Sequence, residues 1–159
     1  MHQFRLLRED GKVKLYGSLR EAMQLALNTC LLIETNEEEG GFIPRKKDEF
    51  KYFRVNNCHS GTKVAAGLYE PDRKQYGETV IASYGDGFCN WGSFHTHPFG
   101  CRALPSLTDL TRLFNGQPNN FIWSPSLHEL NWFEIVSQDT TETIWRMKIV
   151  DLENLKNVS

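Results

Sequence analysis

The chain has 159 residues, of which 40% are hydrophobic and 12% aromatic, enough for an ordinary core without disulfides. Its net charge of -2 gives no general attraction to nucleic acid or to an anionic membrane. No apolar run reaches the roughly 18 residues of a membrane span, and residues 1–8 lack the apolar core of a signal peptide. We therefore expect one cytoplasmic domain over residues 1–159, with its core at about 15–150.

An amphipathic helix is predicted over residues 18–28, because apolar residues recur there at near-helical spacing. Ser18 is the expected N-cap, and Glu21 stands three residues later at the capping-box position. The apolar run 31–33 that follows is either the end of this helix or a connection.

Short apolar segments separated by turn residues predict several strands in the rest of the chain. In chain order they are 40–43 and 50–55 on either side of a polar turn at 45–48, then 90–97, the hairpin pair 121–123 and 130–136, and finally 143–150. A second helix is predicted over 106–114, whereas 62–69 and 76–84 have no decisive pattern. This order predicts a mixed α/β fold with a central sheet flanked by helices.

His95 and His97 stand two residues apart at the end of the predicted strand 90–97, just before Pro98. Residues i and i+2 of a strand point to the same face, so the two imidazoles can converge on one metal ion. Zinc accepts histidine nitrogens in tetrahedral sites. An isolated His-x-His pattern is nevertheless more often an ordinary pair of histidines.

Asp109 is the expected third ligand, since it lies in the first turn of the predicted helix that follows. Three protein ligands and a water are typical of catalytic zinc. Ser106 and Asp109 also form a Ser-x-x-Asp capping box. Capping would fix the Ser106 hydroxyl at the rim of the site, where it could donate to a developing oxyanion. His59 is the spare ligand if Asp109 does not reach the metal, and Cys101 lies in the intervening loop.

A catalytic zinc site also needs a general base. The candidates come from elsewhere in the chain, and the tight acidic cluster is the run 37–39, directly before Gly40 and Gly41. Such a run is usually a solvated turn, but two glycines permit a close backbone approach or a positive φ.

Taken together, His95-x-His97-Pro98, the serine and aspartate that follow, and the upstream Glu38-x-Gly40-Gly41 segment resemble the JAB/JAMM metalloprotease family, the MPN+ domain. The resemblance covers roughly residues 15–136 and implies a curved, cytidine-deaminase-like sheet. It implies Zn2+ bound by His95, His97 and Asp109, Glu38 as general base, and Ser106 as the group that stabilises the tetrahedral intermediate. The loop between His97 and Ser106 is one residue longer than the usual pattern, and the closest likeness is to bacterial stand-alone or toxin-associated members.

The resemblance further implies an isopeptidase that hydrolyses the amide after the C-terminal tail of a ubiquitin-like protein, or of a similar extended peptide. Such a tail could add as a strand at a sheet edge. In bacteria the enzyme could serve an antiviral conjugation pathway or act as an effector. The alternatives are a non-catalytic protein-binding module of the MPN fold and, more remotely, a metal-dependent hydrolase acting on nucleic acid. We expect no nucleic-acid or membrane partner, and the sequence does not predict the oligomeric state.

Overall fold

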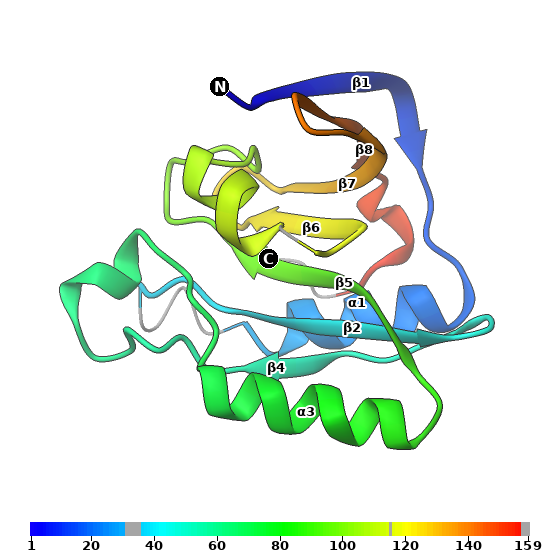
Figure 1. Cartoon of the computed structure of the whole chain (residues 1–159), viewed down its shortest axis with the longest axis vertical. Helices are drawn as coiled ribbons and strands as arrows, with labels where there is room; N and C mark the ends of the chain where they lie inside the picture. Colours follow the sequence, from blue (N-terminus) through cyan, green and yellow to red (C-terminus); the bar gives the residue numbers. More distant parts are fainter. Residues whose placement is uncertain (31–35, 115, 157–159) are drawn as a thin grey trace.

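The computed structural model describes residues 1–30, 36–114 and 116–156. One mixed sheet runs through them in the order β1-β8-β7-β6-β5-β2-β3, and β4 also pairs with β2 (Figure 1). The strands are β1 (Gln3–Val13), β2 (Gly40–Lys46), β3 (Glu49–Phe50), β4 (Phe53–Val55), β5 (Cys89–Thr96), β6 (Asn119–Ser124), β7 (Glu129–Gln138) and β8 (Glu142–Val150). The pairs β1/β8 and β5/β6 are parallel, and the other pairs are antiparallel.

Within the described residues, two α-helices and three shorter helical turns accompany the sheet. They are α1 (Gly17–Asn28), α3 (Arg73–Gly85), the 3-10 turns η1 (Lys63–Ala66) and η3 (Leu152–Asn154), and the π-helical turn η2 (Asp109–Leu113). No helix within the described ranges is long and apolar enough to cross a membrane.

Opposite faces of the sheet carry two separate hydrophobic clusters. The first packs α1 against the sheet through residues such as Met23, Ile43 and Phe94. The second lies beneath η2 and centres on Phe114 and Phe133. Side chains alternate along β5. Because the Phe94 side chain packs on the α1 face of the sheet, the side chains of Ser93 and His95 point to the opposite face, where η2 and α3 lie.

Most predicted elements are confirmed, including the mixed α/β class. The hairpin pair is β6 and β7, the last strand is β8, and the His-x-His strand is β5. The segment 50–55 is divided into β3 and β4, both antiparallel to β2. The helix predicted over 106–114 is largely the π-helical turn η2, in which the Phe114 N–H donates to the Asp109 carbonyl. The run 31–33 lies outside the described residues.

The predicted capping box at the start of α1 is wrong. The helix begins after Tyr16, without a side-chain cap. The Ser18 hydroxyl instead donates to the Asp48 carbonyl and accepts the Phe50 N–H, so it ties α1 to the β2–β3 turn. A tertiary contact has therefore taken over a side chain that could have capped the helix locally.

The sequence did not predict β1 or α3. Strand β1 is a largely exposed edge strand, so it lacks the alternation of a half-buried strand. Helix α3 has little amphipathic pattern, but its start is marked: the Asp72 carboxylate accepts the Gln75 N–H. An N-cap of this type, directly after Pro71, is the signal that could have found the helix.

Candidate metal centre

His95 and His97 converge at the carboxyl end of β5, as the strand periodicity predicts. Their ring centroids lie 5.0 Å apart. His95 is fully buried between the Tyr69 ring, which stacks on it, and Phe114. The Nδ1 of His97 lies 2.8 Å from the Arg102 carbonyl oxygen. If Nδ1 carries the proton and donates to this carbonyl, the Nε2 lone pair is left for a metal.

Asp109 reaches both imidazoles from the first turn of η2. Its Oδ2 lies 3.0 Å from the Nε2 of His97 and 3.3 Å from the Nε2 of His95. The predicted capping box is confirmed: the Ser106 N–H donates to Oδ2 of Asp109, and the Asp109 N–H donates to the Ser106 hydroxyl oxygen. These two bonds fix the Asp109 carboxylate at the strand end and hold the exposed Ser106 at the rim.

The loop between His97 and Ser106 is anchored to the β6–β7 hairpin. Glu129 is the main anchor, since its carboxylate accepts from the Arg102 guanidinium and from the Ala103 N–H. The Asn131 amide donates to the Ala103 carbonyl. The additional loop residue is thus accommodated without freeing the Arg102 carbonyl that contacts His97. Cys101 is exposed, and its sulfur is not among the donor atoms grouped around His95 within the described residues.

Glu38 lies directly beside the histidines, although it is 57 residues away from His95 in the sequence. Gly40 pairs with His95 in the β2–β5 ladder, and the Thr96 N–H donates to the Glu39 carbonyl. This antiparallel register brings Glu38 opposite His97. Donor atoms of Glu38, His95 and His97 all lie within 4.8 Å of one another, and Glu38 is only 4% exposed.

Gly40 and Gly41 allow this approach through close packing and not through a positive φ. A Cβ at Gly40 would overlap the Phe94 carbonyl oxygen and the Tyr69 ring. A Cβ at Gly41 would overlap the Phe53 carbonyl oxygen and the Tyr52 ring. Neither glycine has a positive φ. The double glycine therefore lets β2 lie tightly between β4 and β5.

The two carboxyl groups of the site, Glu38 and Asp109, have pKa values shifted in opposite directions. Burial raises the pKa of Glu38 to about 8; Asp109 adds to this effect and His97 opposes it. Burial would also raise the pKa of Asp109, but the two imidazoles and the Ser106 N–H outweigh it and hold that pKa well below its usual range. Burial acts to lower the pKa of His97, but Asp109 and the Arg102 carbonyl raise it overall. Glu38 is therefore favoured as a proton carrier, and Asp109 as a permanent anion.

These residues fit a zinc ion. The Nδ1 of the fully buried His95 has no hydrogen-bond partner among the described residues, and its Nε2 has a 3.3 Å ion-pair contact with the Asp109 carboxylate but no well-formed hydrogen bond. A buried imidazole with so few polar partners is costly unless another group satisfies it. Two imidazoles and one carboxylate form a donor set that zinc accepts in open sites. His95, His97 and Asp109 are the residues that could hold the metal, with Glu38 beside them.

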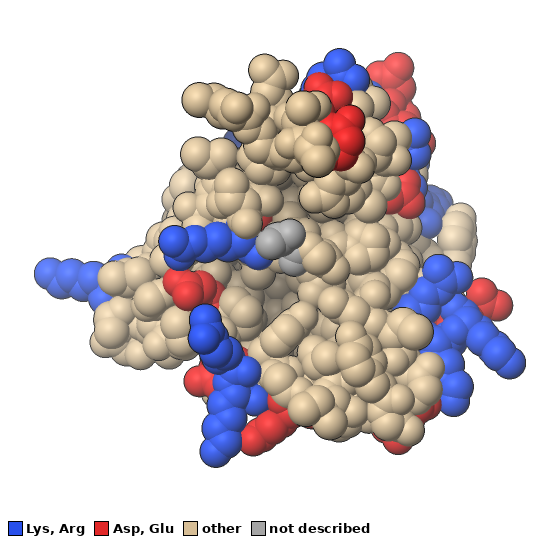
Figure 2. Space-filling view, viewed as in Figure 1, with Lys and Arg blue, Asp and Glu red and all other residues tan. Residues whose placement is uncertain are grey.

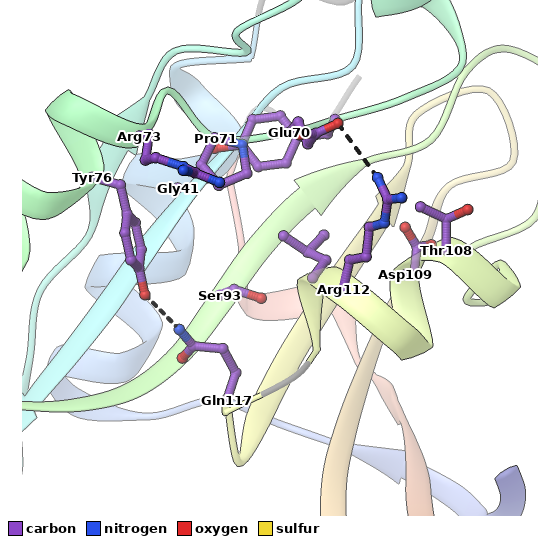
Figure 3. A pocket seen from close by; sticks show the side chains of 12 residues that line it. Gly41, Glu70, Pro71, Arg73, Tyr76, Ser93, Thr108, Asp109, Arg112 and Gln117 are labelled. Atoms are coloured by element: carbon purple, nitrogen blue, oxygen red, sulfur yellow. Dashed lines mark hydrogen bonds and ion pairs between the residues drawn. The ribbon is translucent and has the colours of Figure 1, made fainter. Parts of the chain in front are cut away.

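A pocket of about 290 Å³ adjoins Asp109 and lies between α3 and η2 (Figure 3). Tyr76 and Gln117 are hydrogen-bonded at one end, and the weak ion pair between Glu70 and Arg112 spans the other. On the face seen in Figure 2, basic and acidic side chains are interspersed around a largely uncharged centre. The pocket offers space for a ligand next to the candidate metal-binding residues.

Several contributing groups were not predicted from the sequence. Asn57 is buried and donates to the Glu38 carbonyl, so it supports the segment that carries the predicted base. Tyr69 and Glu129 act through tertiary contacts that have no local sequence signal. Within the described residues His59 is not among the donor atoms grouped around His95; its Nε2 lies 3.1 Å from the Glu70 carboxylate instead. The tryptophans Trp91, Trp123 and Trp132 pack in or against the core.

Comparison with known proteins defines the fold class only. No family model and no curated protein matches the chain. Among solved structures, the chain is similar to the solution structure of protein DSY2949 from Desulfitobacterium hafniense, with 18% sequence identity and a TM-score of 0.50. That match covers 95% of this chain and 97% of the other. The likeness supports a mixed α/β fold of this overall extent and carries no functional information.

Proposed function

We propose that this protein is a zinc metallopeptidase of the JAB/JAMM type. It would hydrolyse the amide bond after the C-terminal tail of a ubiquitin-like protein or of a similar extended peptide, in the cytoplasm. The observation that carries the proposal is the convergence of His95, His97 and Asp109 with a buried acid, Glu38, within 4.8 Å of the histidine donor atoms.

The roles follow from the position of each side chain. Zinc, when bound, polarises a carbonyl and lowers the pKa of water. The Glu38 carboxylate, favoured once a cation is bound nearby, can take a proton and return it to the leaving amine. The Ser106 hydroxyl oxygen accepts the Asp109 N–H, so its own proton remains available for a developing oxyanion. The adjoining pocket can receive part of the peptide.

Substitution of the proposed base tests the enzymatic assignment. We expect Glu38→Gln to keep one zinc at this centre and to lose turnover by at least about 100-fold, the lower range for a general base. The probe is ubiquitin with a fluorogenic amine on its C-terminus, measured beside metal analysis. Glu37→Gln is the matched control, because the Glu37 carboxylate faces Ser60 and Gly61 and not the histidines.

Two results would contradict the proposal. Turnover by Glu38→Gln at the wild-type rate would remove the base from the mechanism. A wild-type protein that binds zinc through His97 but never cleaves the probe would favour the alternative, a protein-binding module of the MPN fold. His97→Ala supplies the metal-deficient reference for both measurements.

A further inference from the structure

A second group of metal-ligating side chains lies apart from the centre around His95. Cys58, His59 and Glu70 each offer one donor atom, and these atoms all lie within 4.8 Å of one another. The Nε2 of His59 and the Oε1 of Glu70 are 3.1 Å apart. We propose that Cys58, His59 and Glu70 form a second zinc site, with water as the fourth ligand.

The backbone that carries these ligands is already ordered. The Cys58 N–H donates to the Glu70 carbonyl, and Asn57 forms an isolated bridge with Pro71. The side-chain oxygen of Asn57 accepts both the His59 N–H and the Glu70 N–H. Two segments of the chain are thus held together beside the cluster. A metal that binds here needs to order side chains only, which lowers the entropic cost of binding.

The donor set selects zinc over the common hard cations. Zinc binds thiolate at about 2.3 Å and imidazole or carboxylate at about 2.0–2.2 Å, so donors in a tetrahedral site lie roughly 3.3–3.8 Å apart. Small side-chain rotations would bring the three donors to those separations. Magnesium and calcium prefer oxygen ligands alone, and a set that includes sulfur disfavours them. Cys58 is exposed and the other two are half-buried, so an ion can reach the cluster from solvent.

The cluster is linked both to the segment that carries Glu38 and to the pocket. Asn57 donates to the Glu38 carbonyl and to the Leu68 carbonyl. The Oε1 of Glu70 lies 3.9 Å from a guanidinium nitrogen of Arg112, a residue of η2, across the pocket (Figure 3). A metal ion on Glu70 would replace this weak exposed ion pair with a much stronger interaction. Such an ion would cross-link Cys58 and His59 to Glu70, directly beside Asn57, which supports the segment carrying Glu38. The inference rests on the cluster itself and not on the proposed peptidase activity.

Cobalt substitution distinguishes the two sites, because only this one contains a thiolate. We expect the wild-type protein to bind two Co(II) ions and to show a near-ultraviolet sulfur-to-cobalt charge-transfer band. His97→Ala should bind one ion and keep the band. Cys58→Ser should bind one ion and lose the band. Glu70→Gln should raise the cobalt dissociation constant of this site by at least about 10-fold. Loss of even an outer-shell partner of a ligand lowers metal affinity 10–100-fold.

Cys89→Ser and Cys101→Ser are the matched controls, since both thiols are also exposed. Each should retain the band. A wild-type protein without the charge-transfer band, or a Cys58→Ser variant that keeps it, would overturn the proposal. Loss of the band in Cys101→Ser would assign the thiolate to the loop beside His97 and would also overturn it. Circular dichroism of each variant ensures that the comparison is made between folded proteins.

Discussion

Three consecutive glutamates, Glu37, Glu38 and Glu39, occupy three different environments. The Gly61 N–H and the Ser60 hydroxyl lower the pKa of Glu37. Glu39 is paired with the Arg54 guanidinium at 2.9 Å. Only Glu38 faces the imidazoles from a buried position, and its pKa is raised to about 8. The three residues are chemically identical, so their different roles depend on the register of β2 against β5, which turns only the Glu38 carboxylate toward the histidines.

The raised pKa of Glu38 predicts how stability depends on pH in the metal-free protein. Folding favours the neutral carboxyl, so its contribution is complete below the ordinary pKa of 4.5 and is lost as the pH rises to about 8. We expect the free energy of unfolding of the wild-type protein to fall, relative to Glu38→Gln, by on the order of 3 kcal/mol between pH 5 and pH 8.

Urea unfolding of both proteins in the presence of a chelator measures this difference. The glutamine variant is the control, because it retains His97 and Asp109, which also titrate abnormally. Parallel pH profiles for the two proteins would show that Glu38 is not desolvated in the folded state.

At the scale of elements, the β2–β5 ladder positions the site through the close approach at Gly40. An alanine there would meet the Phe94 carbonyl, which cannot move without breaking the ladder. We expect Gly40→Ala to destabilise the protein by about 3 kcal/mol, the upper range for overpacking. Gly77→Ala in α3 is the control, because no described atom lies within 4 Å of the new methyl group. It should raise stability by roughly 0.5–1 kcal/mol. Equal thermal midpoints for the two variants would contradict the account.

The loop between β5 and η2 is held in place by the Glu129 carboxylate. Glu129→Gln weakens the contacts that hold Arg102 and Ala103, and with them the carbonyl that contacts His97. We expect zinc affinity at this centre to fall by about 3–10-fold, less than the 10–100-fold loss typical of a direct partner of a ligand. Glu134→Gln is the control, since Glu134 pairs with Arg146 and Lys148 elsewhere. An unchanged zinc dissociation constant for Glu129→Gln would show that the loop is held without this anchor.

The sequence predicts the elements that have a strong periodic pattern, and it misses those set by tertiary contacts. Strand β5 and the capping box at Ser106 were predictable because alternation and the Ser-x-x-Asp spacing are local signals. The β1 strand was not, since it is an exposed edge. The support that Asn57 gives to Glu38 joins residues 19 positions apart and depends on the folded chain. The choice of Glu38 as the proposed base therefore came from the family resemblance and not from the residues alone.

At the scale of the whole molecule, the candidate metal centre joins parts of the fold that pack separately. His95 and His97 come from the end of β5, Asp109 from η2 above the second core cluster, and Glu38 from the entry to β2. The sheet is the rigid platform of the centre, and the capping box of η2 holds Asp109, the third candidate ligand. A metal ion bound here would cross-link η2 to the centre of the sheet.

This cross-link predicts that zinc stabilises the entire fold. A ligand that binds only the folded state stabilises it by about 2.7 kcal/mol at 100 times its dissociation constant. We expect zinc to raise the thermal midpoint of the wild-type protein and a chelator to reverse the rise. His97→Ala should lose most of the effect, and any remainder should disappear in the double variant with Cys58→Ser, because that cysteine belongs to the second cluster. A wild-type midpoint that is the same in zinc and in chelator would show that these ligands do not bind zinc in the folded protein.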